Sequence, residues 1–155
     1  MLQLSRHARR AALLVLSAFA LAACSDDKDD HEVEVDFMRI TAGAQQVMVN
    51  STGAVTGGPL TLQAGVARSI TVDFLKADMT SDALEDEADE FQVALTLPAG
   101  VTFTRTGPFA GTLTASAAGS YNVSFALLHV EENHEDFGPF AVPVSVSAAA
   151  VAVQR

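Results

Sequence analysis

Apolar and polar residues alternate along most of the chain from residue 33 onward. In residues 70–74, the apolar side chains of Ile70, Val72 and Phe74 are separated by polar ones. This period of two places every second side chain on one face of a β-strand, whereas an amphipathic helix would show a period of 3.6. The same pattern predicts further short strands at residues 33–37, 47–49, 91–97, 101–103, 121–127 and 140–146, and one around Leu113.

Turn-forming residues separate the predicted strands. Glycine and proline occur at 57–59, 98–100 and 107–111, between apolar segments. About seven to nine short strands with such turns are typical of two packed sheets, so the pattern predicts an all-β fold, a single Ig-like antiparallel β-sandwich. Pro143 has no backbone N–H, and we therefore expect its strand to lie at a sheet edge or to carry a bulge. The acidic residues 78–90 are predicted to form a long loop or a short helix.

Composition narrows the class of protein. The chain has 155 residues, of which 49% are hydrophobic, and this is enough for one domain with its own core. The formal net charge of −10 repels phosphate groups, so no nucleic-acid partner is expected. The single cysteine excludes an intramolecular disulfide and a cysteine-rich zinc site.

The N-terminal residues have the features of a secretion signal. Three arginines within residues 1–10 precede an apolar stretch at residues 11–21, which is too short for a membrane-spanning helix of about 20 apolar residues. The sequence Leu21-Ala22-Ala23-Cys24 follows and resembles the lipobox of bacterial lipoproteins. The resemblance implies cleavage before Cys24, a diacylglyceryl group on its thiol, and acylation of its new amine by a chain such as palmitate. Several acyl chains give stable anchoring in a membrane.

This resemblance also implies an organisation and a location. The implied parts are a signal peptide at 1–23, an acidic flexible tether at 24–32, the sandwich at 33–147 and a C-terminal tail at 148–155. The mature chain would keep six of the nine basic residues and all 19 acidic ones, for a formal charge of −13. Because Ser25 and not Asp follows Cys24, we expect an outer-membrane lipoprotein, on the periplasmic face or at the cell surface. The acidic residues 25–30 are also similar to tethers that some bacteria use to send lipoproteins to the cell surface. Alternatively, they form a plain solvated linker.

The C-terminal half resembles a second family. Leu97-Pro98-Ala99-Gly100, Gly111-Thr112 and Ala118-Gly119-Ser120-Tyr121 are similar to motifs of the putative-Ig, cadherin-like modules of bacterial surface proteins. The similarity covers roughly residues 91–146, about a third of the chain. It implies an Ig-like sandwich that acts in adhesion, spacing or binding, and it implies no chemistry.

The densest group of metal-ligand side chains lies between the last two predicted strands. It contains His129 and His134 together with carboxylates that include Glu132 and Asp136. His129 is in phase with the apolar positions of its strand, and His134 is expected in the loop that follows. A turn between them would bring both imidazoles within reach of one Cu, Zn or Ni ion, with either carboxylate as a further ligand. His31, close to the first predicted strand, completes the candidate set.

Other interpretations of this segment stay open. An acidic loop between two strands is usually a solvated hairpin tip. Its carboxylates also offer hard oxygen ligands for Ca²⁺, although no Asp-x-Asp-x-Asp-Gly loop is present. Catalysis is not expected, because the sequence has no Gly-x-Ser-x-Gly elbow and no free cysteine once Cys24 is lipidated. The sequence therefore predicts a membrane-anchored, non-catalytic binding or spacer module with an envelope protein or polymer as partner. The alternative is a periplasmic or surface metal-binding protein.

Overall fold

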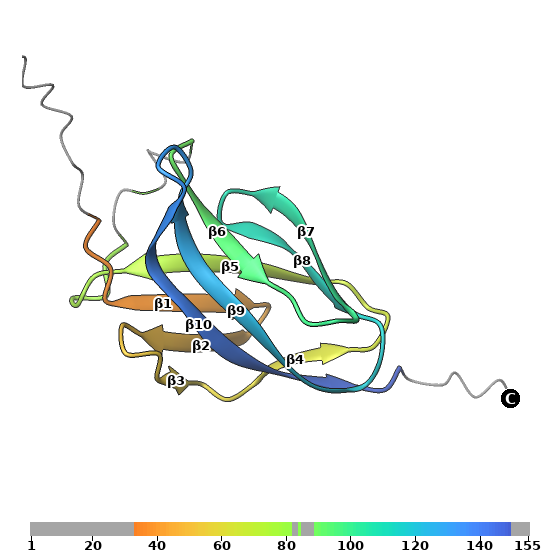
Figure 1. Cartoon of the computed structure of the whole chain (residues 1–155). Coiled ribbons are helices and arrows are strands. Elements are labelled where there is room, and N and C mark those ends of the chain that lie inside the picture. The colour runs from red at the N-terminus through yellow and green to blue at the C-terminus, as the bar shows by residue number, and fades with distance from the viewer. Residues whose placement is uncertain (1–32, 82–83, 85–88, 150–155) are drawn as a thin grey trace, which may run out of the picture. The chain divides into compact units, whose positions relative to one another are not determined.

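Ten β-strands form the described part of the chain, which comprises residues 33–81, 84 and 89–149 of a computed structural model (Figure 1). No helix in these residues is long and apolar enough to cross a membrane. The strands are β1 (Phe37–Ala42), β2 (Gln45–Asn50), β3 (Val55–Thr56), β4 (Leu60–Gln63), β5 (Arg68–Leu75), β6 (Phe91–Thr96), β7 (Val101–Gly107), β8 (Ala110–Ala115), β9 (Gly119–His129) and β10 (His134–Ser147). The predicted signal peptide, the candidate lipidation site Cys24 and the tether lie outside the described residues.

The strands form two sheets. The six-stranded sheet has the order β3-β2-β1-β5-β8-β7, and the four-stranded sheet has the order β4-β10-β9-β6. Figure 1 shows the long strands β9 and β10 crossing in front of β1, β2 and β5. The predicted all-β sandwich is therefore confirmed.

Buried apolar side chains from both sheets form one core. In β1, the alternate residues Met38, Ile40 and Ala42 are fully buried, and the residues between them are partly exposed. In β9, Val123 and Phe125 are fully buried in the same way. This alternation is the one expected when one face of each strand packs against the opposite sheet.

Three features differ from the sequence expectations. β10 pairs with β4 in parallel over four residues, so the sandwich is mixed and not entirely antiparallel. The described residues contain ten strands and not seven to nine, because β3 and β4, with only two and four residues, show no long alternation and were not predicted. The strand predicted at residues 33–37 is wrong: β1 begins at Phe37, and Val33 and Val35 precede it as partly buried residues that pack against the core.

β10 contains both Pro143 and two register shifts, at different places along the strand. β10 lies between β9 and β4, so the expected edge position is wrong. Pro143 pairs with Asn122 of β9, and the pairing of β10 with β4 begins only at Val144. The register of β10 against β9 shifts between Glu135 and Phe137, and again between Phe137 and Phe140. β10 therefore does carry bulges, at the end near the hairpin turn.

Gly138 lies within the second register shift. Its φ is +94°, and the peptide bond to Pro139 is cis. A Cβ atom at Gly138 would lie 2.7 Å from the backbone oxygen of Phe125 and 3.2 Å from the Cα of Ala126, so glycine allows β10 to approach β9 closely. The expected turn at residues 137–140 is thus part of β10.

Arg105 connects the two sheets. From β7 its Nη2 donates a hydrogen bond to the backbone oxygen of Val93 in β6, at 2.7 Å. Its Nη1 donates to the backbone oxygen of Pro108 at 2.8 Å. The guanidinium carbon lies 5.9 Å from the centre of the Phe103 ring, which holds the side chain along the sheet edge.

The acidic segment at 78–90 is only partly within the described residues. The Asp78 carboxylate accepts hydrogen bonds from the hydroxyl of Thr80 at 2.6 Å and from its backbone N–H at 3.0 Å. Both bonds lower the pKa of Asp78 below its ordinary value, and the bond from the hydroxyl has the larger effect. Leu84 is buried in the core with 5% of its surface exposed. Residues 82–83 and 85–88, in the segment predicted as a long loop or a short helix, lie outside the described residues.

Candidate metal site

A row of three rings crosses three neighbouring strands at one end of the four-stranded sheet. Phe91 of β6 is the direct partner of His129 in β9, and His129 is the direct partner of His134 in β10. The ring centres of Phe91 and His129 are 4.6 Å apart, and those of the two histidines are 5.5 Å apart. Direct cross-strand partners have Cβ atoms about 4.5–5.5 Å apart, so the sheet register itself brings the imidazoles together.

A tight turn at residues 130–133 closes the β9–β10 hairpin. Its last residue, Asn133, has a φ of 52°, a conformation that asparagine adopts more readily than most residues. The backbone N–H of Val130 donates to the oxygen of Glu90 at 2.7 Å and ties the turn to the start of β6. The turn is shorter than the sequence analysis expected, and His134 therefore begins β10 and does not lie in a loop.

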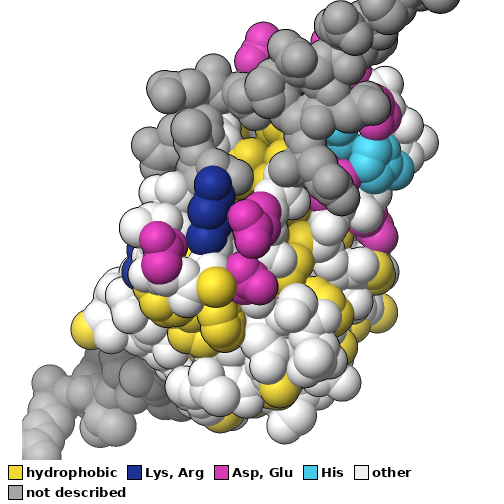
Figure 2. All heavy atoms as spheres, turned by 90° about the vertical axis from the view of Figure 1, so that its left-hand side faces the viewer, with side chains coloured by type: hydrophobic (Ala, Val, Ile, Leu, Met, Phe, Trp, Pro, Cys, Tyr) yellow, Lys and Arg dark blue, Asp and Glu magenta, His cyan; other side chains and the backbone are white. Residues whose placement is uncertain are grey.

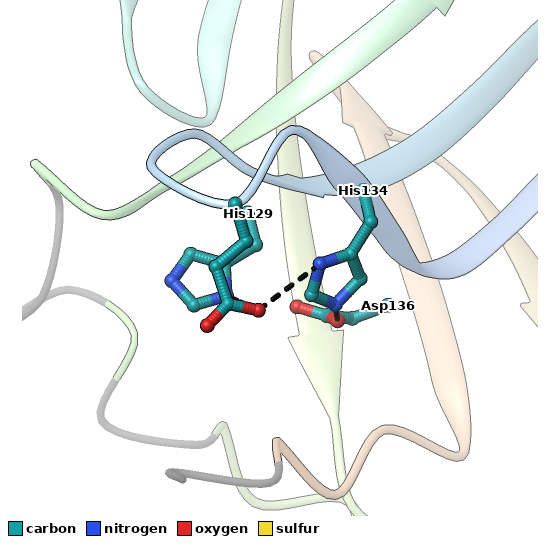
Figure 3. Close-up of polar contacts among 4 residues, drawn as sticks. His129, His134 and Asp136 are labelled. Atoms are coloured by element: carbon teal, nitrogen blue, oxygen red, sulfur yellow. Dashed lines mark ion pairs between the residues drawn. The ribbon is translucent and has the colours of Figure 1, made fainter. Parts of the chain in front are cut away.

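Two carboxylates face the histidines. The Oε2 atom of Glu132 lies 3.2 Å from Nδ1 of His134 and 3.6 Å from Nδ1 of His129. The Oδ1 atom of Asp136 lies 2.5 Å from Nε2 of His134. Figure 3 shows the His134 ring with one polar contact at each of its nitrogens. These contacts are ion pairs when the imidazole is protonated, and a neutral imidazole offers a nitrogen lone pair to a metal ion.

Exposure differs among the four side chains. His129 and Asp136 are each 17% exposed, whereas His134 and Glu132 are 49% and 50% exposed. The second carboxylate oxygen of Asp136 is buried and has no hydrogen-bond partner in the described part of the chain. Figure 2 shows the histidines at the molecular surface with acidic side chains beside them. Solvent therefore reaches the cluster at His134 and Glu132.

Four of the five candidate ligands converge. One ligand atom from each of His129, His134 and Asp136 lies within 4.8 Å of the others, and Glu132 contacts both histidines. His31 lies outside the described residues. A mixed set of imidazole nitrogens and carboxylate oxygens suits Zn²⁺, Cu²⁺ and Ni²⁺, whereas Ca²⁺ takes about six to eight oxygen ligands. The arrangement is thus a better match to a transition metal than to calcium.

Phe91 is the contributor that the sequence analysis missed. Its ring is 1% exposed, and it lies against His129 at an interplanar angle of 31°. It restricts the rotation of the imidazole on the buried side of the site. The sequence shows Phe91 only as one apolar residue of a predicted strand, because nothing local indicates which residue of β9 it will face.

The chain was compared with protein-family models and with curated proteins. No protein-family model matches the chain. A search of curated proteins gave no match either.

Proposed function

We propose that this chain is a lipid-anchored, non-catalytic β-sandwich protein of the bacterial outer membrane that binds a divalent transition metal ion at the β9–β10 hairpin. One observation carries the metal assignment: two imidazoles and two carboxylates from a single hairpin converge at contact distances of 2.5 to 3.6 Å. Zn²⁺, Cu²⁺ and Ni²⁺ are the ions that this donor set favours. Binding of the ion, and not turnover of a substrate, is the proposed activity.

The anchor is supported by the N-terminal sequence alone. The arginine-rich start, the apolar residues 11–21 and Leu21-Ala22-Ala23-Cys24 agree in kind and order with a lipoprotein signal. Lipidation at Cys24 would attach the sandwich to the membrane through the acidic tether. A Cys24→Ser variant expressed in a bacterium should leave the membrane fraction and appear in the soluble fraction. Equal membrane recovery of the variant and the unaltered chain would refute the anchor.

A second function, a metal-free binding or spacer module for an envelope protein or polymer, is favoured by a different observation. An apolar hollow of about 310 Å³ opens between β5, the β7–β8 turn and Leu84. Val72, Phe74 and Phe109 are among the side chains that line it. An apolar surface of this kind suits contact with a partner, and it needs no metal ion.

Isothermal titration calorimetry separates the two functions. Protein stripped with a chelator is titrated with Zn²⁺, Cu²⁺, Ni²⁺ and Ca²⁺, each as a separate experiment. The metal function predicts one site per chain for the transition metals and loss of most of the affinity in His129→Ala and in His134→Ala. Glu135→Gln, an exposed change in the same hairpin, serves as the control and should bind as the unaltered chain does. No binding of any ion would leave the metal-free module.

A further inference from the structure

The contacts of Glu132 have the spacing of ligands on one metal ion. Zinc binds nitrogen and oxygen ligands at about 2.0–2.2 Å in a tetrahedron, so two of its ligand atoms lie about 3.3–3.6 Å apart. The Oε2 atom of Glu132 is 3.2 Å from Nδ1 of His134 and 3.6 Å from Nδ1 of His129. The Glu132 carboxylate therefore lies close to ligand–ligand spacing from each of the two Nδ1 atoms before any ion binds.

Asp136 does not have this spacing. Its Oδ1 atom is 2.5 Å from Nε2 of His134, which is a hydrogen-bond distance and is too short for two ligands of the same ion. It also faces the ring nitrogen that lies on the other side of the imidazole from Nδ1, so an ion held by Nδ1 of His134 lies away from it. Histidine ligands commonly donate their second N–H to a carboxylate, which fixes the ring orientation and the tautomer.

We propose that the ion is held by Nδ1 of His129, Nδ1 of His134 and the carboxylate of Glu132, and that Asp136 is a positioning residue for His134. This inference rests on the proposed metal function. The ion takes the place among the three ligand atoms, on the side where His134 and Glu132 are half-exposed. Three protein ligands leave the fourth position of a tetrahedral ion to water or to a small anion from solvent. The ligand class is a divalent, borderline transition metal ion.

The fold explains why Nδ1, and not Nε2, of each histidine would bind the ion. The imidazole of His129 is fixed on its buried side by Phe91, and its Nδ1 faces Glu132. The imidazole of His134 is fixed at Nε2 by Asp136, whose side chain is only 17% exposed. Both rings therefore present Nδ1 to the same carboxylate. The turn at residues 130–133 carries Glu132 and places its carboxylate within 3.6 Å of Nδ1 in both rings.

Nitrogen NMR of the metal-loaded protein tests this assignment without any mutation. Long-range ¹H–¹⁵N correlation spectra of the Zn²⁺-loaded chain distinguish a metal-bound ring nitrogen from a protonated one. The expected result is metal at Nδ1 and a proton at Nε2 in both His129 and His134. Metal at Nε2 of His134 would overturn the assignment, because that nitrogen would then no longer donate to Asp136.

Three variants test the roles of the carboxylates by calorimetry with Zn²⁺. Glu132→Gln should lower the affinity by 100-fold or more, because an amide is a poor replacement for a charged ligand. Asp136→Ala should lower it by about 10- to 100-fold, as expected for a residue that orients a ligand. Asp136→Asn should recover most of that loss, because its amide oxygen still accepts the Nε2–H. Glu131→Gln, an exposed change in the same turn, is the control and should have no effect.

The possible results distinguish a failure of the ligand assignment from a failure of the metal function. If the unaltered chain binds no transition metal, the proposed function fails. If it binds Zn²⁺ but Asp136→Asn loses as much affinity as Asp136→Ala while Glu132→Gln binds normally, the function stands and the assignment is overturned. Circular dichroism of each variant establishes that the sandwich is folded before its affinity is compared.

Discussion

The close approach of β10 to β9 at Gly138 makes a quantitative prediction about stability. Replacing Gly138 by alanine adds a Cβ atom 2.7 Å from the backbone oxygen of Phe125. Backbone atoms cannot rotate away as a side chain can, so β10 must move off β9 at this point. The residue also keeps a φ of +94°, which alanine adopts only with strain.

Two costs add at Gly138. The left-handed backbone conformation costs a residue other than glycine about 1–2 kcal/mol. Forcing an extra methyl group into a packed site costs a further 1–3 kcal/mol or so. We therefore expect Gly138→Ala to lower the free energy of unfolding by about 2–5 kcal/mol, which is a large part of the roughly 5–15 kcal/mol typical of a folded domain.

Gly58 supplies a matched control. Its φ is +78° and it also precedes a proline, but no atom lies within 4 Å of the position of an added Cβ. Gly58→Ala therefore pays only the backbone cost of about 1–2 kcal/mol. Urea unfolding of both variants, followed by circular dichroism, measures the difference. Equal losses for the two alanine variants would refute the argument that backbone contact at Gly138 sets the β9–β10 alignment.

Three further predictions concern other parts of the sandwich. Arg105→Lys should lower the free energy of unfolding by about 1–2 kcal/mol in urea titrations, because lysine lacks the planar fork that bonds the backbone oxygens of Pro108 and Val93 together. Unchanged stability would contradict the bridge between the sheets. Phe125→Ala should cost about 3–5 kcal/mol, since the ring is fully buried; a loss under about 1 kcal/mol would contradict its place in the core. Thr80→Val should raise the pKa of Asp78 toward 3.8, as followed by ¹³C NMR; an unchanged pKa would contradict the hydrogen bond.

The sign of the Asp78 effect on stability follows from linkage. A carboxyl group whose pKa is lower in the folded state than in the unfolded state stabilises the fold above the unfolded pKa. That contribution is lost as the pH falls through the folded pKa. Any stability difference that Thr80→Val causes through this group should therefore be present near neutral pH and disappear in strong acid.

Long alternations predicted the strands well, and short ones did not. β5 and β9 carry several apolar residues at a period of two, and both were identified from the sequence. β4 has four residues, and it is held as a strand by its parallel pairing with the far end of the chain. A pairing between residues so distant in sequence leaves no local signal. The parallel ladder was missed for this reason. β3 pairs with β2, which is close in sequence, and was missed because its two residues show no alternation.

The candidate site was predictable in composition and not in geometry. His129, Glu132, His134 and Asp136 lie close in sequence, so their grouping was visible at once. The direct pairing of the two histidines depends on the length of the turn and on the bulges of β10, which the sequence did not reveal. The distances from the Glu132 and Asp136 carboxylates to the imidazole nitrogens depend in turn on the register of β10 against β9.

Thermal unfolding with and without metal tests the central claim, that the β9–β10 hairpin binds a transition metal ion, most directly. The chelator-stripped protein is melted alone and with Zn²⁺, beside a variant that carries both His129→Ala and His134→Ala. An ion that binds only the folded state stabilises it by about 2.7 kcal/mol at a hundredfold excess over Kd, so the melting temperature of the unaltered chain should rise by several degrees. The double variant should show no rise. An equal rise in both proteins, or none in the unaltered chain, would contradict the account.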